Sequence, residues 1–330
     1  MAKRLDVYGI GNALMDLQVQ ITEQEFDKLQ LTKGAMQLVD VNTQEKLLQR
    51  FCTQPIHQAS GGSAANSLIA IGQLGGQGSY ACLVGQDRFG EFYLEEMSSL
   101  GISLHNAPIV GQPTGTCLIL ITPDAERTLN TALGATSLFA PEHVSEEQIE
   151  SAEWLYIEGY LLSSERGTEA ALRAAMAAKR CGTKVALTFS DTFIVNVFRN
   201  NLEQVLQYTD LAFANYHEAL AFAQSTDEEQ GFRALQDAVP NAIMTLSERG
   251  AWAHFAGETF FAEPFKVKPI DNTGAGDMFA GAFLYGITHG KSPQVAAKLA
   301  CFLASRVVSQ LGPRLIQNPL EIPEVRAILA

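Results

Sequence analysis

Three small residues, Gly274, Ala275 and Gly276, stand directly before an acid, Asp277, and the apolar stretch 278–284 that follows is typical of a buried helix. If a helix begins here, its first backbone N–H groups are free and point at one spot, where the helix dipole favours negative charge. A phosphate could approach that backbone closely, and the carboxylate of Asp277 could accept a proton from an attacking hydroxyl. A tight turn at an ordinary helix N-terminus is the alternative, and this stretch alone leaves both open.

A second glycine turn lies within 60–76, where Gly61 and Gly62 also precede a helical pattern. Asn66 falls in the first turns of that helix, and its amide could both donate and accept hydrogen bonds. A tight turn packed against a sheet is again the alternative.

A third stretch, 9–16, begins like the fingerprint of dinucleotide-binding proteins, with Gly9 and Gly11 after a strand pattern. The third glycine is missing, because Leu14 occupies its position, and no ribose-binding acid ends a second strand. A nicotinamide-dependent oxidoreductase is therefore a remote alternative. Asp16 is more informative, since a carboxylate there could hold a vicinal diol with two hydrogen bonds, although a solvated surface acid would have the same pattern.

Two further polar turns follow strand patterns. Asn215 and Glu218, within 214–219, share one face of an emerging helix and could reach a phosphate or a metal-bound water. An N-cap residue with an ordinary first-turn acid is the alternative. In 245–251 a strand pattern leads into a polar turn and then into Gly250.

The elements that must position these residues alternate between short β-rich and helical segments, which predicts an α/β fold with a doubly wound, mostly parallel sheet. The polar residues singled out above follow the carboxyl ends of successive strands, where open α/β sheets bind ligands. The predicted strands are 5–10, 79–85, 153–159, 183–189, 210–215 and 241–247, and the predicted helices are 63–74, 88–100, 165–181, 216–223, 275–289 and 293–310.

Two regions break this alternation. Residues 13–40 and 112–135 alternate polar and apolar residues with a period of two, which predicts the strands of a small inserted sheet. Beside an α/β core, such a sheet is expected to act as a lid that excludes water from a reaction. We therefore expect a single domain over 1–330, with the lid formed by these two regions.

The composition narrows the class of protein. The 330 residues include 23 basic and 36 acidic side chains, for a formal net charge of −13. This balance argues against a nucleic-acid binder or an anionic-membrane binder, but not against a local nucleotide site. The five cysteines form no CxxC pair, so we expect reduced core residues. No signal-peptide or membrane-span pattern is found, and a cytoplasmic protein is expected.

Four motifs together resemble the signature set of the ribokinase-like (PfkB) carbohydrate and nucleoside kinases. They are GGSAAN at 61–66, GQDRFGEFYLEEMSSLGI at 85–102, NYHE at 215–218 and DNTGAGD at 271–277, in that family's order and at its spacing. The resemblance covers essentially the whole chain. It implies a ribokinase-like α/β domain with a small β-lid that often serves as a homodimer interface, and a kinase that uses ATP and Mg²⁺ on a small-molecule hydroxyl.

The resemblance also implies roles for individual residues. Asp277 matches the catalytic base that takes the proton from a substrate CH₂OH group, and the turn 274–276 matches the anion hole for the transferring phosphoryl group. The positions that match substrate contacts are Asp16, Gly62 and Asn66 for sugar hydroxyls and Glu158 for a ribose.

The nucleotide and its ions are matched by a separate set. Asn215 and Glu218 match the element that organises Mg²⁺ and phosphates, the latter through water. The loop that follows the ATP phosphates and ribose is matched by Thr245, Ser247 and Gly250, the adenine flank by Cys301, and a K⁺-type monovalent-cation site by Asp271 with backbone carbonyls near Thr273, Val307, Gln310 and Gly312. Asn272 departs from the family's usual threonine, and Ser247 and Glu248 stand where smaller residues are commoner.

The lid suggests a substrate. LTKGAMQLVD and AERTLNTALGA resemble the adenosine kinase branch more than the ribokinase branch, so we expect an adenosine-like nucleoside first and a ribose- or fructose-type sugar second. Arg127 resembles an arginine that moves onto the phosphates or the substrate when such lids close, with an exposed strand residue as the alternative. Tyr160 and Phe193 are candidates for stacking on a purine, with core packing as the alternative. A non-catalytic sugar or nucleotide sensor is a further alternative, and the retained Asp277 beside its glycine turn argues against it.

Overall fold

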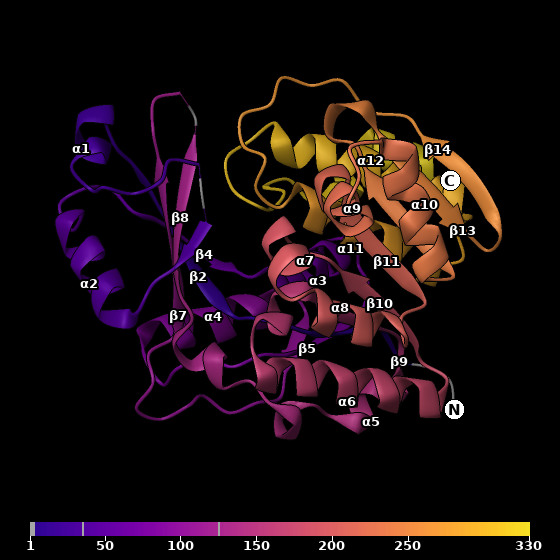
Figure 1. The fold of residues 1–330 in the computed structure, drawn as a ribbon, viewed down its shortest axis with the longest axis horizontal. Helices are drawn as coiled ribbons and strands as arrows, with labels where there is room; N and C mark the ends of the chain where they lie inside the picture. The colour runs from indigo at the N-terminus through magenta and orange to yellow at the C-terminus, as the bar shows by residue number, and fades with distance from the viewer. Residues whose placement is uncertain (1–3, 35, 125) are drawn as a thin grey trace.

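The computed structural model describes residues 4–34, 36–124 and 126–330 (Figure 1). Two sheets organise this part of the chain. The larger is mostly parallel with helices on both faces, and the smaller stands beside it at the left of Figure 1. The predicted doubly wound α/β fold with a small additional sheet is confirmed.

The larger sheet has the strand order β14-β13-β12-β11-β10-β9-β1-β5-β6. Neighbouring strands are parallel from β12 to β6, whereas β13 and β14 are antiparallel. This final hairpin was not among the predicted strands, because it departs from the βα alternation. The bounds are β1 Leu5–Ile10, β5 Gly78–Ala81, β6 Ile102–Leu104, β9 Ala152–Glu158, β10 Lys184–Thr188, β11 Leu211–Asn215, β12 Asn241–Thr245, β13 Ala251–Phe255 and β14 Glu258–Ala262.

Helices cover both faces of this sheet and divide its core into two clusters of buried side chains. One face packs against α3 (Ser63–Gln73), α4 (Arg88–Ser99), α11 (Ala275–Thr288) and α12 (Pro293–Val308), and α13 (Pro323–Leu329) packs against α12. The other face packs against α5 (Glu146–Ser151), α6 (Glu165–Cys181), α7 (Thr192–Val197), α8 (Arg199–Leu206), α9 (Tyr216–Ala223) and α10 (Glu228–Ala238). The six predicted helices correspond to α3, α4, α6, α9, α11 and α12, within two residues at either end.

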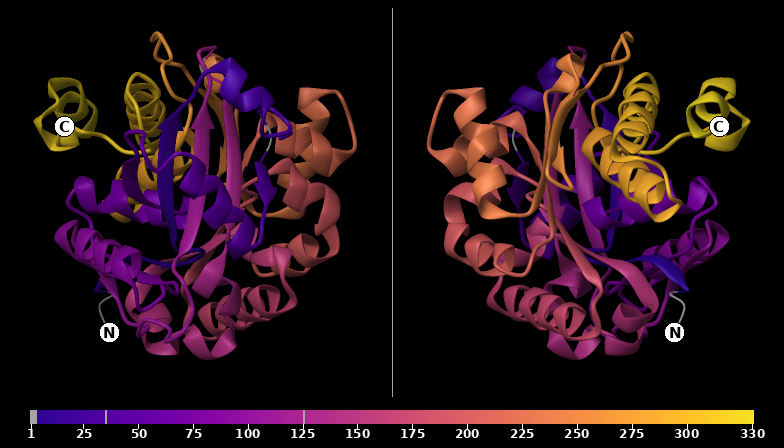
Figure 2. Two further views of the ribbon diagram at one scale, coloured as in Figure 1. Left: turned by 90° about the vertical axis from the view of Figure 1, so that its left-hand side faces the viewer. Right: turned by 90° about the vertical axis from the view of Figure 1, so that its right-hand side faces the viewer.

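The smaller sheet, which we call the lid sheet, has the order β3-β8-β7-β2-β4. Helices α1 (Glu23–Asp27) and α2 (Val41–Arg50) lie on its outer side, and the left view of Figure 2 looks onto this side of the molecule. Four of its strands fall in the two predicted regions, while β4 lies outside them. The bounds are β2 Leu14–Gln20, β3 Met36–Leu38, β4 His57–Gly61, β7 Gly115–Ile121 and β8 Arg127–Ala132.

Strand β4 has a direct consequence for the site. It pairs antiparallel with β2, with Leu14 opposite Gly61 and Asp16 opposite Ala59. Because β4 leads straight into α3, this pairing carries the glycine turn of 60–76 to the side of Asp16. Two motifs 45 residues apart in the sequence thereby share one wall of the same site.

The composition led to expectations about membrane spans and about the cysteines. No helix in the described ranges is long and apolar enough to cross a membrane. All five cysteines are free thiols, in line with the absence of disulfides. Cys82, Cys117 and Cys301 are buried, but Cys52 and Cys181 are exposed, so the prediction of core residues is wrong for those two.

Candidate active site

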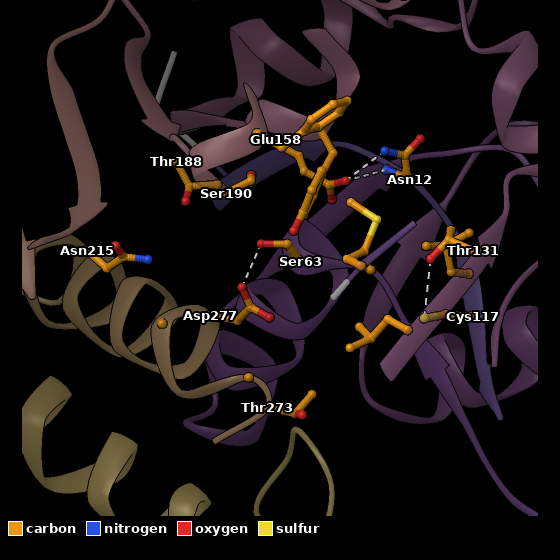
Figure 3. A pocket seen from close by; sticks show the side chains of 18 of the residues that line it. Asn12, Ser63, Cys117, Thr131, Glu158, Thr188, Ser190, Asn215, Thr273 and Asp277 are labelled. Atoms are coloured by element: carbon orange, nitrogen blue, oxygen red, sulfur yellow. Dashed lines mark hydrogen bonds between the residues drawn. The ribbon is translucent and has the colours of Figure 1, made fainter. Parts of the chain in front are cut away.

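A cavity of about 350 Å³ lies between the lid sheet and the carboxyl ends of the large sheet's strands (Figure 3). Its lining comes from both sheets and from the turn that begins α11. Residues far apart in the sequence therefore meet around one space. The residues singled out in the sequence that line it are Asp16, Gly62, Glu158, Tyr160, Phe193, Asn215, Glu218, Thr245, Asn272, Thr273, Gly274, Ala275, Gly276 and Asp277.

Two glycines in the turn before α11 differ in the space around them: Gly274 is closely surrounded by protein, and Gly276 has free space beside it. Gly274 is the N-cap residue with a φ of 74°, and a Cβ there would lie 2.5 Å from the carbonyl oxygen of Pro313. A side chain at this position would therefore meet both backbone strain and a clash. At Gly276, which lines the cavity, a Cβ would meet no atom of the described chain within 4 Å apart from its chain neighbours and its own helix backbone.

The N–H groups of this turn are also open. Met278 donates to the carbonyl of Gly274, which closes the first helical turn. No acceptor within the described ranges receives the N–H of Gly276 or that of Asp277. Free N–H groups at a helix N-terminus bind anions, since the helix dipole adds to their partial positive charge. The turn thus has the form of an anion site that faces the cavity.

Asp277 is held by two residues from the first turns of α3. Ser63 Oγ donates to one carboxylate oxygen at 2.6 Å (Figure 3). Asn66 Nδ2 donates to the other at 2.9 Å. Burial raises the pKa of Asp277 to about 6, and the hydrogen bonds from Ser63 and Asn66 oppose that rise. The group is therefore mostly ionised at neutral pH, yet basic enough to take a proton.

Glu158 ends β9 and is only 1% exposed. One of its oxygens accepts from Asn12 Nδ2 at 2.8 Å, and the other accepts from the backbone N–H of Ala64 at 2.9 Å. Burial raises the pKa of Glu158 to about 7, against the effect of these hydrogen bonds. Glu158 thus caps the N-terminus of α3 while it lines the cavity.

The glycine pair before α3 makes room for protein atoms. A Cβ at Gly61 would lie 2.4 Å from an oxygen of Asp16, and one at Gly62 would lie 2.1 Å from the carbonyl oxygen of Asn12. Gly62 also has a φ of 105°. Asp16 is itself buried, which raises its pKa to about 7, while the nearby charge of Arg314 acts to lower it.

Asn215 and Glu218 form a capping box at the start of α9. Asn215 Oδ1 accepts from the N–H of Glu218 at 2.9 Å, and Glu218 accepts from the N–H and the side-chain amide of Asn215. The capping alternative is therefore correct, but it is incomplete. Glu218 is 4% exposed and lines the cavity, whereas a first-turn acid normally reaches solvent, and burial raises its pKa to about 8.

Most of the remaining nucleotide positions lie apart from this cavity. Thr245 lines it at the end of β12, but Ser247, Gly250 and Cys301 are not among its lining residues. Gly250 has a φ of 98°, and a Cβ there would lie 2.3 Å from the carbonyl oxygen of Ala262. Cys301 is buried in α12, where burial raises its pKa to about 12.

The predicted cation loop holds a cation that belongs to the chain. Asp271 is 2% exposed, and the guanidinium of Arg127 forms an ion pair with it. Arg127 also donates to the hydroxyl of Thr273, and the N–H of Gly312 donates to Asp271 at 2.7 Å. Arg127 is therefore neither an exposed strand residue nor a lining residue of the cavity. The side-chain amide of Gln310 donates to the backbone carbonyl of Arg314, and the role of the backbone carbonyl of Gln310 stays a prediction.

The sequence analysis missed Ser63 and Asn12 among the lining residues, and it missed the neighbouring pair of Arg314 and Glu96. Ser63 was visible as the residue after the glycine pair, and Asn12 as the residue after the first strand's glycines. Arg314 pairs with Glu96 at 3.0 Å and donates to the carbonyl of Ser60, so it ties the C-terminal loop to β4. Only the long-range pairing of these segments brings Arg314 and Glu96 to the site, and no local pattern signals that.

The glycines of the dinucleotide-like stretch have a packing role. A Cβ at Gly9 would lie 2.7 Å from Leu68, and one at Gly11 would lie 2.5 Å from an oxygen of Glu158. The first strand and α3 thus lie so close that only glycine fits between them. Nothing in this arrangement leaves the backbone open to a pyrophosphate.

Comparison with known proteins gives the class of the enzyme. Residues 52–319 match the pfkB family carbohydrate kinase. The chain belongs to this family and is a phosphotransferase that acts on a hydroxyl group, so the oxidoreductase alternative is wrong.

Individual relatives cover almost the full length of the chain. The structure of a "probable sugar kinase protein" from Rhizobium etli CFN 42 is 34% identical, with a TM-score of 0.93 and coverage of 99% of both chains. The adenosine kinase from Sinorhizobium meliloti is 33% identical, with a TM-score of 0.89 and coverage of 96% of this chain and 97% of that one. The adenosine kinase of Saccharomyces cerevisiae is 29% identical over 328 residues, which is 92% of this chain and 95% of the yeast protein.

Proposed function

We propose that the enzyme transfers the γ-phosphoryl group of ATP to a primary hydroxyl of an adenosine-like nucleoside, with Asp277 as the general base. One observation carries the proposal. The carboxylate of Asp277 shares the wall of the cavity with a helix N-terminus whose N–H groups at Gly276 and Asp277 find no acceptor in the described part of the chain. A base beside an anion site is what phosphoryl transfer to a hydroxyl requires.

In the proposed reaction, the substrate hydroxyl loses its proton to Asp277 as its oxygen attacks the γ-phosphorus. The bond from phosphorus to the ADP oxygen breaks, and the negative charge on the transferring group meets the N–H groups of Gly276 and Asp277. Ser63 and Asn66 fix the direction of the carboxylate, which retains lone pairs for the incoming hydroxyl. The proton then passes from Asp277 to solvent when the product leaves.

Glu218 and Asn215 fit a site for Mg²⁺ bound to ATP, although only indirectly. Both oxygens of Glu218 already accept hydrogen bonds from Asn215, so the pair suits a contact through the ion's water shell. In the described ranges, no group of three or more His, Cys, Asp or Glu side chains is placed to hold a metal ion. When bound, Mg²⁺ supplies positive charge to the phosphates.

The cavity lining supports an uncharged substrate with an apolar portion. Four carboxylates line it, from Asp16, Glu158, Glu218 and Asp277, and the described lining includes no lysine, arginine or histidine. The phosphate of a phosphorylated sugar would find no cation in this lining to pair with. The apolar wall, which suits a nucleobase better than a sugar hydroxyl, is formed by Leu14, Met36, Leu38, Leu129, Leu133 and Phe193.

The lid sheet supplies much of this apolar wall, so we propose that it closes over the nucleoside and excludes water. Of the two stacking candidates, Phe193 is the better placed, since it is exposed at the cavity and not in the core. Tyr160 also lines the cavity, but its hydroxyl donates to Asp191 at 3.3 Å. Dimerisation through the lid sheet stays a prediction, which light scattering on the purified chain would test.

A sugar kinase is the second candidate, favoured by the 34% identity to the "probable sugar kinase protein". A coupled ADP-release assay across adenosine, inosine, guanosine, ribose, fructose and fructose 6-phosphate separates the two. We expect the highest kcat/KM with a purine nucleoside and none with fructose 6-phosphate. A preference for ribose or fructose would replace the nucleoside by a sugar, and turnover of fructose 6-phosphate would contradict the charge argument.

A further inference from the structure

The carboxylate of Asp271 is buried and fully engaged. One of its oxygens accepts from the N–H of Thr273 at 2.7 Å, and the other accepts from the N–H of Gly312 at 2.7 Å. The guanidinium of Arg127 pairs with the same carboxylate. A buried carboxylate is costly unless it is paired and hydrogen-bonded, and here both conditions are met by the chain itself.

Arg127 reaches this position from the lid sheet. It is the first residue of β8 and lies opposite Ile121 of β7, while Asp271 lies 144 residues further along the chain, three residues before the N-cap Gly274. Its second bond, to the hydroxyl of Thr273, comes still closer to the anion-site turn. One side chain therefore connects the lid sheet to the turn that begins α11.

With Arg127 in place, the ligands expected for a monovalent cation leave no room for a free ion. Both oxygens of Asp271 have N–H donors besides the guanidinium, and the carbonyl of Val307 accepts from the N–H of Gln310 at 3.2 Å, so each keeps only part of its capacity to accept a cation. The side chain of Arg127, only 14% exposed, brings a full positive charge to the carboxylate where K⁺ would have to bind. The guanidinium and a K⁺ ion bound to the same buried carboxylate would repel each other strongly.

We infer that Arg127 is a built-in cation that takes the place of K⁺ at Asp271 and ties the lid sheet to the anion-site turn. The inference rests on the proposed function only for the role of that turn. Arginine suits the task, because its planar fork binds the carboxylate and the Thr273 hydroxyl together and it never loses its charge. Arg127 is thus a positioning residue that acts on the reaction through the loop 271–273.

The test measures thermal unfolding of the full-length chain without nucleotide, in KCl and in choline chloride at equal ionic strength. Wild type should melt at the same temperature in both salts. The R127Q variant should melt several degrees lower in choline chloride and recover part of that loss in KCl, because the uncovered carboxylate of Asp271 then accepts the ion. Arg50→Gln is the matched control, because Arg50 is an exposed arginine at the end of α2. It should leave the melting temperature unchanged in both salts.

A second pair of variants isolates the charge of Asp271. In the D271N background, R127Q should lower the melting temperature much less than it does alone, since the two residues interact with each other. In the kinase assay, wild type should keep its rate when K⁺ is replaced, and R127Q should become K⁺-dependent. Wild type that needs K⁺ for stability or for rate would overturn the inference, and so would an R127Q variant indifferent to K⁺. The melting data remain decisive even if the nucleoside screen fails, so the two failures are distinguishable.

Discussion

Helices α11 and α3 both begin with glycines at the wall of one cavity, but their surroundings are opposite. Before α3, the spaces that side chains of Gly61 and Gly62 would occupy hold atoms of Asp16 and Asn12. The N–H of Ala64 in the same turn is taken by Glu158. Before α11, the space beyond Gly276 is open, and its N–H finds no acceptor in the described chain.

This difference separates two uses of glycine that look alike in a sequence. One turn is closed by the protein, so its glycines serve close packing, and its helix N-terminus is already capped by a carboxylate. The other turn is closed on one side only, at Gly274, and remains open toward the cavity at Gly276. A side chain added to the first should therefore damage folding, and a side chain added to the second should damage catalysis.

The largest expected effect comes from Asp277→Asn, which keeps the shape of the side chain but removes the base. We expect kcat with the preferred substrate to fall by about 10²–10⁴-fold, as for other positioned bases. The melting temperature should change little, because the isosteric amide still fits between Ser63 and Asn66. Single-turnover ADP release measures the effect, and a near-wild-type rate would remove Asp277 from the mechanism.

The open turn is tested by Gly276→Ala. The methyl group meets no protein atom, and alanine favours the helix, so the free energy of unfolding should stay the same or rise by up to about 1 kcal/mol. The methyl adds volume at a residue that lines the cavity, and a phosphoryl group displaced by about 1 Å loses roughly 10²-fold in rate. Denaturant unfolding and kcat together give the answer. Full activity in this variant would mean that the turn does not hold the transferring group.

The closed turn is tested by Gly62→Ala. Its φ of 105° and the carbonyl of Asn12 at 2.1 Å from the new Cβ predict a loss of at least about 1–3 kcal/mol in unfolding free energy. Gly101→Ala is the matched control, since Gly101 has a φ of 77° but no neighbour within 4 Å, so it measures the backbone strain alone. If both variants lose the same stability, the contact with Asn12 contributes nothing and the contrast between the turns is weaker than we describe.

The sequence predicted the parts of the site that local patterns encode. The strand ends, the helix after Gly276 and the position of Asp277 follow from periodicity and glycine placement. It could not predict that β4 joins the lid sheet, because residues 57–61 show no clear alternation and their pairing with β2 depends on tertiary contacts. The pairing of Arg127 with Asp271 could not be predicted for the same reason, since Arg127 lies in the lid sheet and Asp271 in the loop before α11. Local patterns also could not tell a glycine packed by protein from one that faces a ligand.

The smallest expected effect links the two turns through Ser63, which donates from the closed turn to the base at the open one. This hydrogen bond favours the ionised carboxylate, so Ser63→Ala should raise the pKa of Asp277 above its value of about 6, by about one unit or less. Because the ionised base is the active form, activity rises with pH through this pKa, and the acidic limb of the kcat profile should move to higher pH.

In Ser63→Ala, the rate near pH 8 should change much less than the rate near pH 6. Ser63→Thr should return the acidic limb to its wild-type pH, since threonine keeps the hydroxyl. Ser67→Ala is the control for a lost serine hydroxyl one turn further along α3, where the partners are the carbonyl of Ser63 and the hydroxyl of Tyr156. A uniform loss of rate at every pH in Ser63→Ala would show that Ser63 supports the fold of the turn without tuning the base. The closed turn would then act on the open one by packing alone.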